Sequence, residues 1–429
     1  MKALINVRFY DFETYKEDMY ILFDHMIEEV GEMKDYKNDG YLEIDATNNL
    51  VMPSLVNGHS HIYSTFARGL NVEFHPTNFQ ELLEQLWWKL DSNLDNKMNY
   101  YSSVVSGVDY LKNGVTTIID HHASGEIEGS LDSIKQGLDD VGLRGIYCFE
   151  TSDRFNVEAC VTENVGFISK NHSNYSLGLF GMHAAFTLSD ESLKLISKRN
   201  KAPIHIHVAE SKMDQEISLK RHGKRVISRL NDFGLIHKNS ILTHCLYLEE
   251  EELDIIKKKE AVIALNVTSN MNNAVGLPDY ESMKQKGIKV IIGNDGISSK
   301  MTSEYQMLYY AMHHKTASPT EVNFGDIIDV INTTYDYASE MLDCRLGKLK
   351  EGYQADILMI PYEPFTPLNN LNIFGHLFFG LFNDFKPSNV FVGGIQILNE
   401  YQVSDTLTKK YKEANNHSKR LFEKIEKGA

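Results

Sequence analysis

The sequence predicts an α/β fold in which a (β/α)₈ TIM-like barrel is joined to a small β-sandwich domain. Seven apolar runs of strand length recur between residues 114 and 295, and polar segments with helical spacing separate them. Apolar strands alternating with amphipathic helices are typical of a parallel sheet covered on both faces. An eighth run precedes them at residues 50–58. Eight strands favour a closed barrel over an open doubly wound sheet.

The expected barrel strands follow one another along the chain. After "LVMPSLVNG" (50–58) come "GVTTIID" (114–120), "GLRGIYCFE" (142–150), "YSLGLFGMH" (175–183), "APIHIHVAE" (202–210), "SILTHC" (240–245), "AVIALNV" (261–267) and "KVIIGND" (289–295). The segments between them, such as residues 189–200 and 248–260, have the apolar spacing of helices. No glycine-rich phosphate-binding motif follows the first strand, which argues against a dinucleotide-binding sheet.

The two ends of the chain are predicted to form one small β domain beside the barrel. Residues 1–52 contain short strands and turns, with a hairpin turn expected at "KNDG" (37–40). Residues 346–398 again contain short strands broken by glycines. Because these two regions flank the barrel, expected at residues 53–345, we predict that they pair with each other.

The remaining residues, 399–429, are predicted to form a C-terminal helix. Leu407, Tyr411, Ala414 and Leu421 recur at helical spacing, so the segment has one apolar face. Its lysine-rich face is expected to be solvated rather than to bind a partner.

Composition excludes several classes of function. The net charge is −16, and such an acidic protein repels the phosphates of nucleic acid. No apolar run reaches the ~18 residues that a membrane span needs, and charges come too early for a signal peptide. The four cysteines show no CxxC spacing, which fits a reducing compartment. We therefore expect a cytoplasmic protein with neither a membrane nor nucleic acid as partner. A homodimer is a separate expectation that composition does not test.

Metal-ligand and acid–base residues stand at the C-terminal ends of the predicted strands, where a barrel of this kind carries its active site. His59 and His61 are two residues apart on a strand, so both side chains point to the same side. One such pair is weak evidence in a chain with 17 histidines, but the ordered set across the strands indicates a metal-dependent hydrolase. Its members are His59, His61, His121, His122, Glu150, His183, His207, Glu210, His244 and Asp295.

The motifs "NGHSH", "HVAE", "THC", "NVTSNM" and "GNDG" resemble the amidohydrolase superfamily, in particular the aminohydrolases that include guanine deaminase, adenosylhomocysteine deaminase and the triazine hydrolases. Through "HIYSTFARGL", "DHHAS", "MHAAFTLSDE" and "SNMNNAVG" the chain is most similar to SsnA-type aminohydrolases. The resemblance implies that His59, His61, His207 and Asp295 bind one divalent metal. Zn²⁺ is expected, with Fe²⁺ or Mn²⁺ as alternatives.

The resemblance also implies catalytic roles. Glu210 would shuttle a proton to the substrate, and Asp295 would take the proton that the attacking water loses. His244 would orient the water or polarise the attacked carbon. His183 matches a substrate-contacting position. His205 precedes the HxxE motif that singles out His207, and we interpret it as an inner-layer residue of the barrel.

Three further side chains are candidate substrate contacts. A helix expected at residues 79–91 carries Trp88, which would stack on a flat ring or else pack in the core. Asn270 would read a polar edge of the ring. Arg68 would meet a carbonyl-bearing or anionic group or else hold the loop in place.

Two departures from the family pattern affect the site. Residues 265–270 lack the His and Pro of an HNPxSN-like stretch, which leaves the substrate contacts of this loop open. The dinuclear branch of the superfamily has a carbamylated lysine where this chain has His183, so one metal is favoured. His121, His122 and Glu150 remain as candidates for a second metal site.

The function expected from these residues is that of a metal-dependent aminohydrolase. A metal-activated hydroxide would attack a ring carbon of a purine-like nitrogen heterocycle and release ammonia. Ring-opening hydrolysis of a cyclic amide by the same site is the first alternative. A non-catalytic metal-binding or scaffold protein is the second, and the intact set of Glu210, His244 and Asp295 argues against it.

Overall fold

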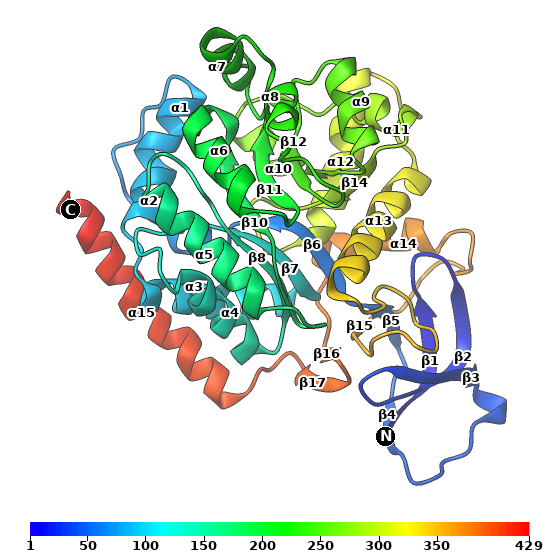
Figure 1. Ribbon diagram of the computed structural model, residues 1–429. Helices are drawn as coiled ribbons and strands as arrows, with labels where there is room; N and C mark the ends of the chain where they lie inside the picture. Colours follow the sequence, from blue (N-terminus) through cyan, green and yellow to red (C-terminus); the bar gives the residue numbers. More distant parts are fainter. Residues whose placement is uncertain (429) are drawn as a thin grey trace.

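The computed structural model describes residues 1–428 and contains the predicted barrel beside a β domain built from both chain ends (Figure 1). The strands of the two ends lie together on one side of the barrel. The C-terminal helix crosses to the other side. The α/β fold class expected from the sequence is thus the observed one.

The barrel consists of parallel strands in two hydrogen-bonded arcs, β6-β7-β8-β9 and β10-β11-β12-β13-β14. Isolated parallel bridges, Thr151 to Met182 and Ser60 to Asp295, join the arcs at both ends and close the barrel. The fourth strand is divided at Leu179, so that β9 pairs with β8 and β10 with β11. The strands are β6 (Leu55–Ser60), β7 (Val115–His122), β8 (Arg144–Phe149), β9 (Ser176–Gly178), β10 (Phe180–Ala184), β11 (Ile204–Val208), β12 (Ile241–His244), β13 (Val262–Leu265) and β14 (Lys289–Ile292).

Closure of the barrel depends on a close approach of two backbones. A Cβ atom at Gly293 would lie 2.5 Å from the backbone N and O of His59, so only glycine fits there. Beyond this glycine, the Asp295 N–H donates to the His59 carbonyl (3.1 Å) and the His61 N–H donates to the Asp295 carbonyl (2.8 Å). The first and last barrel strands therefore bring three candidate metal ligands together.

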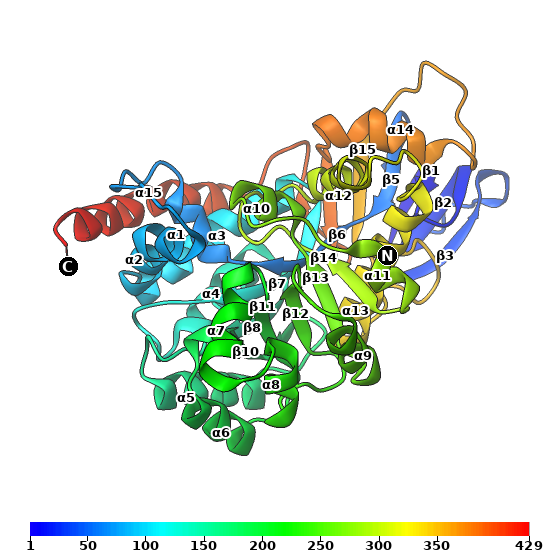
Figure 2. The ribbon, with the colours of Figure 1, turned by 90° about the horizontal axis from the view of Figure 1, so that it is seen from above.

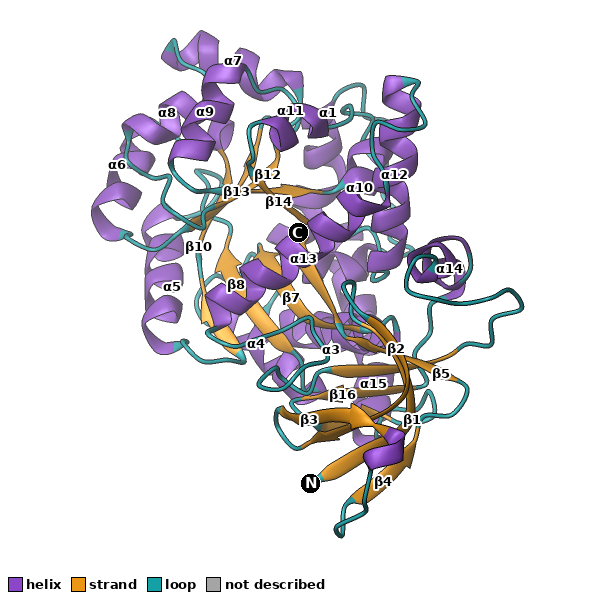
Figure 3. Ribbon diagram, turned by 90° about the vertical axis from the view of Figure 1, so that its right-hand side faces the viewer, coloured by secondary structure: helices purple, strands orange, loops and turns teal. Residues whose placement is uncertain are grey.

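Helices surround the barrel on its outer face (Figure 3). In α4, for example, Leu131, Ile134, Leu138 and Val141 are buried at three- and four-residue steps, as expected for an amphipathic helix covering a sheet. The helices after the barrel strands are α3 (Asn96–Lys112), α4 (Ser130–Val141), α5 (Val157–Lys170), α6 (Asp190–Arg199), α7 (Lys212–His222), α8 (Val226–Asp232), α9 (Glu250–Lys258), α10 (Val267–Asn272), α11 (Tyr280–Gln285), α12 (Met301–Thr316) and α13 (Phe324–Leu342).

The strand expected at residues 50–58 is in fact two strands. β5 (Asn49–Pro53) belongs to the terminal β domain, and β6 begins the barrel. Ser54 separates them: its N–H donates to the Asp356 carbonyl (3.0 Å), and its hydroxyl bonds Thr116 (2.5 Å). The chain thus passes from one domain to the other within a single residue.

The terminal β domain interleaves strands from the two chain ends. Its order is β17-β16-β15-β5-β1-β2-β3, and β4 pairs with β1, so β5 lies between a C-terminal and an N-terminal strand. Figure 2 shows β15 beside β5 and β1. The strands are β1 (Lys2–Tyr10), β2 (Tyr15–Phe23), β3 (Ile27–Glu32), β4 (Leu42–Asp45), β15 (Ile357–Pro361), β16 (Asn389–Val392) and β17 (Ile395–Leu398).

The hairpin turn predicted at residues 37–40 is wrong. β4 pairs with β1 in parallel rather than with β3, so these residues belong to a longer connection. The glycine there, Gly40, does have a positive φ of 88°, which explains why the segment has the composition of a turn.

The C-terminal helix α15 (Asp405–Glu426) packs against α3, with Leu407, Ala414 and Leu421 buried. Lys410 of this helix pairs with Asp140 of α4. Between β6 and α3, the loop expected to be helical forms α1 (Phe79–Leu82), a π-helical turn (Leu83–Trp87) and α2 (Trp88–Ser92).

Within residues 1–428, no helix is both long and apolar enough to cross a membrane.

Candidate metal centre and substrate pocket

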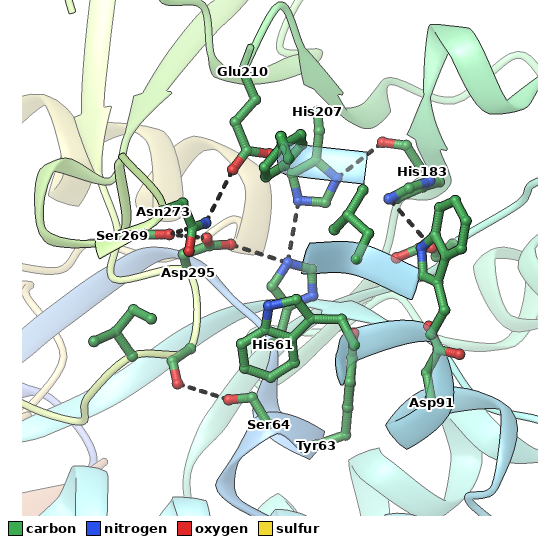
Figure 4. Close-up of a pocket in the computed structure, with 17 residues that line it drawn as sticks. His61, Tyr63, Ser64, Asp91, His183, His207, Glu210, Ser269, Asn273 and Asp295 are labelled. Atoms are coloured by element: carbon green, nitrogen blue, oxygen red, sulfur yellow. Dashed lines mark hydrogen bonds and ion pairs between the residues drawn. The ribbon is translucent and has the colours of Figure 1, made fainter. Parts of the chain in front are cut away.

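A pocket opens at the C-terminal ends of the barrel strands, under the helical loop that follows β6 (Figure 4). One side carries imidazole and carboxylate groups, and the other carries aromatic and aliphatic side chains. Its lining residues are His61, Tyr63, Ser64, Phe79, Leu83, Trp87, Trp88, Asp91, Glu150, His183, His207, Glu210, Ser269, Asn273, Asp295, Gly296 and Ile297. The strand ends that the sequence singles out therefore meet in one concave site.

The four residues expected to bind metal lie in one cluster. His59, His61, His207 and Asp295 each offer a ligand atom, and these atoms all lie within 4.8 Å of one another. Nε2 of His59 is 3.0 Å from Asp295 Oδ1, and Nε2 of His61 is 3.1 Å from the same oxygen. Neighbouring ligands of a tetrahedral zinc ion are about 3.3 Å apart, because Zn–N bonds are about 2.0–2.1 Å long. The spacing of the cluster suits such an ion.

In His61 and His207, the hydrogen bond made by Nδ1 leaves a lone pair on Nε2, and the two Nε2 atoms face each other. Nδ1 of His61 donates to the His121 carbonyl (2.7 Å), and Nδ1 of His207 donates to the His183 carbonyl (2.9 Å). A carbonyl oxygen only accepts, so in the neutral rings each Nε2 presents a lone pair. These two Nε2 atoms are 3.1 Å apart. A proton on one of them or a metal ion between them relieves this contact, and the donor set fits a metal.

The electrostatics of the cluster lead to the same conclusion. Burial alone would lower the pKa of His61, but the hydrogen bond to Asp295 outweighs it and raises that pKa to about 9. Burial would also raise the pKa of Asp295, yet the contacts with His59 and His61 hold it well below its usual value. Burial lowers the pKa of His207 well below its usual value. Asp295 and His207 are thus held in the forms that bind metal, an ionised carboxylate and a neutral imidazole, whereas His61 favours a proton that a bound metal ion would displace.

His205 supports the cluster from behind. It is fully buried, and its Nε2 lies 2.8 Å from Nδ1 of His59. On its other side, Nδ1 of His205 is 3.6 Å from the sulfur of Cys148. Its position is thus an inner one, but it holds the ring of a candidate metal ligand, a role that the sequence alone did not suggest.

Glu210 and His244 stand beside this cluster. Oε2 of Glu210 is 3.4 Å from Nε2 of His244, and both side chains are buried. Asn273 donates to Oε1 of Glu210 (3.3 Å), and the Asp214 carboxylate accepts the Glu210 N–H (2.8 Å). Burial raises the pKa of Glu210 well above its usual value and lowers that of His244 to about 3. Glu210 therefore holds a proton that it can deliver.

The structure places two of the candidate substrate contacts in the pocket. His183 and Trp88 both line it, with their ring centroids 6.1 Å apart. The positions of Arg68 and Asn270 correct the expectations for these residues. The Arg68 side chain is 56% exposed and pairs with Asp109 (2.5 Å), so it anchors the loop outside the pocket. The Asn270 amide is buried against Nδ1 of His244 (2.8 Å) and does not line the pocket.

Two lining residues that the sequence analysis missed come from the same helix. Ser269 and Asn273 are four residues apart at α10, so they share the face that looks into the pocket, whereas Asn270 points elsewhere. The Ser269 hydroxyl bonds Asp295, and the Asn273 amide reaches Glu210 (Figure 4). The helical spacing of "SNMNN" was the signal for this pair.

Of the three residues proposed for a second metal site, His121 and Glu150 form a cluster with His61 rather than with His122. Ligand atoms of His61, His121 and Glu150 lie within 4.8 Å of one another. However, both nitrogens of His61 are already used, and the Arg154 guanidinium donates to Glu150 (3.1 Å). A second cation there would have to lie beside this guanidinium and share Glu150 with it. His122 is fully buried and does not line the pocket.

Comparison with known proteins identifies the family. The model of the amidohydrolase family matches residues 50–397, which include every candidate metal ligand described above. The chain belongs to the amidohydrolase family. This amidohydrolase is 26% identical over 398 residues to the 5'-deoxyadenosine deaminase of Methanocaldococcus jannaschii, with 90% of this chain and 92% of the relative covered.

Solved structures show the same fold. An adenosine deaminase from Xanthomonas campestris with bound zinc superimposes with a TM-score of 0.81 at 16% identity, covering 97% of this amidohydrolase and 98% of that chain. The zinc complex of atrazine chlorohydrolase from Arthrobacter aurescens has a TM-score of 0.80 at 19% identity, covering 98% and 100%. These similarities confirm the barrel with its sandwich from both chain ends.

Proposed function

We propose that this amidohydrolase is a metal-dependent aminohydrolase that deaminates a purine-like nitrogen heterocycle, and that it is an SsnA-type member of the family. The observation that carries the proposal is the convergence of three imidazoles, Asp295 and the buried Glu210–His244 pair at one end of an aromatic pocket. A relative and a structural neighbour are named deaminases of adenosine-type compounds, which supports this reaction class.

We propose that His59, His61, His207 and Asp295 hold one divalent ion, Zn²⁺ by preference. The 3.1 Å approach of two imidazole lone pairs supports a metal here, and zinc is bound in both structural neighbours described above. When bound, such an ion supplies a water nucleophile at neutral pH and polarises the attacked ring. The Arg154 guanidinium beside Glu150 supports one ion rather than two.

The side chains of this chain then move the protons. Asp295, held by Ser269, accepts the proton that the water loses as its oxygen bonds to the ring carbon. His244, whose Nε2 lies 3.4 Å from Oε2 of Glu210, would orient the attack. Glu210 delivers its proton to the departing nitrogen, because an amine leaves badly unprotonated. The C–N bond breaks and ammonia leaves. The proton of the new hydroxyl moves to the ring nitrogen, so that a carbonyl replaces the amino group, and the proton on Asp295 returns to Glu210. Trp88 and His183 would hold the ring.

Ring opening of a cyclic amide is the competing outcome, and the same residues would carry it out. The zinc-loaded protein should be incubated with amino-purines, amino-pyrimidines, pterins and cyclic amides, followed by an ammonia assay and mass spectrometry. Deamination exchanges an amino group for oxygen and releases ammonia, whereas ring opening adds one water and releases none. Cleavage of acyclic esters or peptides, with no heterocycle consumed, contradicts both.

A further inference from the structure

One wall of the pocket carries more hydrogen-bond acceptors than donors. Glu150 follows β8, is 3% exposed and lines the pocket. Its Oε1 is 3.8 Å from Nε2 of His183, and its Oε2 is 3.8 Å from Nδ1 of His121. Both separations are too long for a hydrogen bond.

The neighbours of His183 define its hydrogen position. The Thr187 hydroxyl donates to the Ala184 carbonyl (2.9 Å), so its oxygen accepts from Nδ1 of His183 (3.2 Å). The ring hydrogen of neutral His183 is therefore on Nδ1. Its Nε2 presents a lone pair toward Glu150.

The same argument applies to His121. Nε2 of this ring lies 3.0 Å from the Met182 carbonyl and 3.2 Å from the His205 carbonyl, both of which only accept. Nδ1 is therefore a lone pair, and it is fully buried without a partner. The Glu150 carboxylate thus lies between two imidazole lone pairs. A group that supplies N–H donors is missing from this wall.

Arg154 keeps the carboxylate in place without satisfying it. Its guanidinium donates to Glu150 (3.1 Å) and to both oxygens of Asp91 (3.2 and 2.8 Å). It also lies 4.6 Å over the Trp88 ring and 4.7 Å over the Phe155 ring. One cation thus serves two carboxyl groups, and the Glu150 oxygens keep acceptor capacity for further donor groups.

We propose that Glu150 and His183 together bind an N–H donor edge of the substrate. The substrate class is then a purine-like base whose six-membered ring carries, besides the leaving group, an amino group or a ring N–H, and this rests on the proposed function. An amino group between Oε1 and Nε2 can donate one hydrogen to each, at about 2.9 Å. The six-membered ring of adenine, apart from its leaving amino group, offers only acceptor nitrogens and C–H groups, so adenine leaves both acceptors unpaired.

The test uses two bases that differ only in one amino group, 2,6-diaminopurine and adenine. Their dissociation constants for the zinc-loaded full-length protein are measured by calorimetry, and turnover is measured separately by ammonia release. We expect 2,6-diaminopurine to bind at least ~10-fold more tightly, since sites built for a polar group reject analogues that lack it. Equal affinities, tighter binding of adenine, or no binding of either base overturns the proposal without any variant.

A pair of variants assigns the preference to Glu150. Glu150→Gln replaces one acceptor oxygen by a donor and should bring the affinity ratio close to one, with zinc content by mass spectrometry unchanged. Asp91→Asn removes the same charge beside the same guanidinium and is the matched control, which should keep the ratio. A ratio unchanged in Glu150→Gln contradicts the role of this residue. If 2,6-diaminopurine binds more tightly but no ammonia is released, the proposed deamination is wrong and the donor-edge proposal stands. If both bases bind equally and ammonia is released, the donor-edge proposal is wrong and the proposed deamination stands.

Discussion

The Asn270 amide lies 2.8 Å from Nδ1 of His244, and the opposite nitrogen of that ring, Nε2, lies 3.4 Å from Glu210. The contact fixes the ring from behind and directs Nε2 to the reacting side. His244 also has a positive φ of 70°, so its backbone is held in a left-handed conformation at the end of β12. Asn270 is therefore a positioning residue rather than a substrate contact.

Replacing Asn270 by Ala should lower kcat by about 10–100-fold, because His244 loses the partner that orients it. KM should change little, since the Asn270 side chain does not line the pocket. Steady-state kinetics on any substrate found in the panel provides the measurement. A large rise in KM with kcat unchanged would instead restore the substrate-contact role predicted from the sequence.

Removing a candidate metal ligand should empty the site. His207→Ala and Asp295→Asn should each purify with far less than one zinc per chain by elemental analysis, and chelation of the wild type should lower its Tm. His122→Gln is a suitable control, since this histidine lies outside the pocket and outside the four-residue cluster. Full zinc content in both ligand variants would show that the metal, if bound, is elsewhere.

His205 should contribute to metal affinity without touching the metal. Because its Nε2 lies 2.8 Å from Nδ1 of His59, His205→Phe keeps a buried ring but loses the acceptor. We expect zinc affinity, measured by competition with a chelator, to fall by about 10–100-fold. His205→Gln, which can still accept a hydrogen bond, should recover part of the loss. Identical affinities in all three proteins would make His205 a packing residue only.

Glu210→Gln separates binding from chemistry. The amide cannot deliver a proton, so kcat should fall by at least ~10²-fold, while zinc content and substrate affinity stay near those of the wild type. Binding is measured by calorimetry and turnover by ammonia release. An active Glu210→Gln protein would assign proton delivery to another group, and His244 would be the next to test.

The sequence predicts the barrel and the cluster well because both depend on local patterns. Apolar runs mark strands, and residues at strand ends must meet once the barrel closes; this is how His61 and Asp295, far apart in the chain, come together. The split of residues 50–58 could not be predicted this way. Both of its strands are apolar, and only the pairing of β5 with β1 and β15 shows that it lies in the other domain.

Substrate contacts were harder to predict because their orientation depends on tertiary structure. Asn270 and Asn273 differ by three positions, yet only the second faces the pocket, which requires knowing where α10 begins and how it docks. Likewise, nothing local indicates that Arg154 pairs with Asp91, 63 residues away, to shape the wall around Glu150. The sequence alone does not show whether Arg68 or Arg154 lies near the pocket. In the fold, Arg154 contacts the pocket residue Glu150, whereas Arg68 pairs with Asp109 outside the pocket.

The last prediction concerns a buried carboxyl outside the proposed metal centre. Glu304 on α12 is fully buried, and its only hydrogen-bond donor among the described residues is the Thr268 N–H (3.3 Å). Burial raises its pKa to about 7 from an ordinary value of 4.5. The folded protein therefore keeps this proton up to about pH 7, whereas the unfolded chain releases it near pH 4.5.

This difference makes Glu304 stabilising below pH 4.5 and progressively less so as the pH rises toward 7. Across that window the contribution falls by about 3 kcal/mol, at 1.36 kcal/mol for each pKa unit. Glu304→Gln stays neutral, so its stability relative to the wild type should rise between pH 5 and pH 8. Urea denaturation of both metal-free proteins at the two pH values measures this, and the comparison cancels the titration of the histidines. Parallel stability curves for the two proteins would mean that Glu304 is already ionised in the folded state.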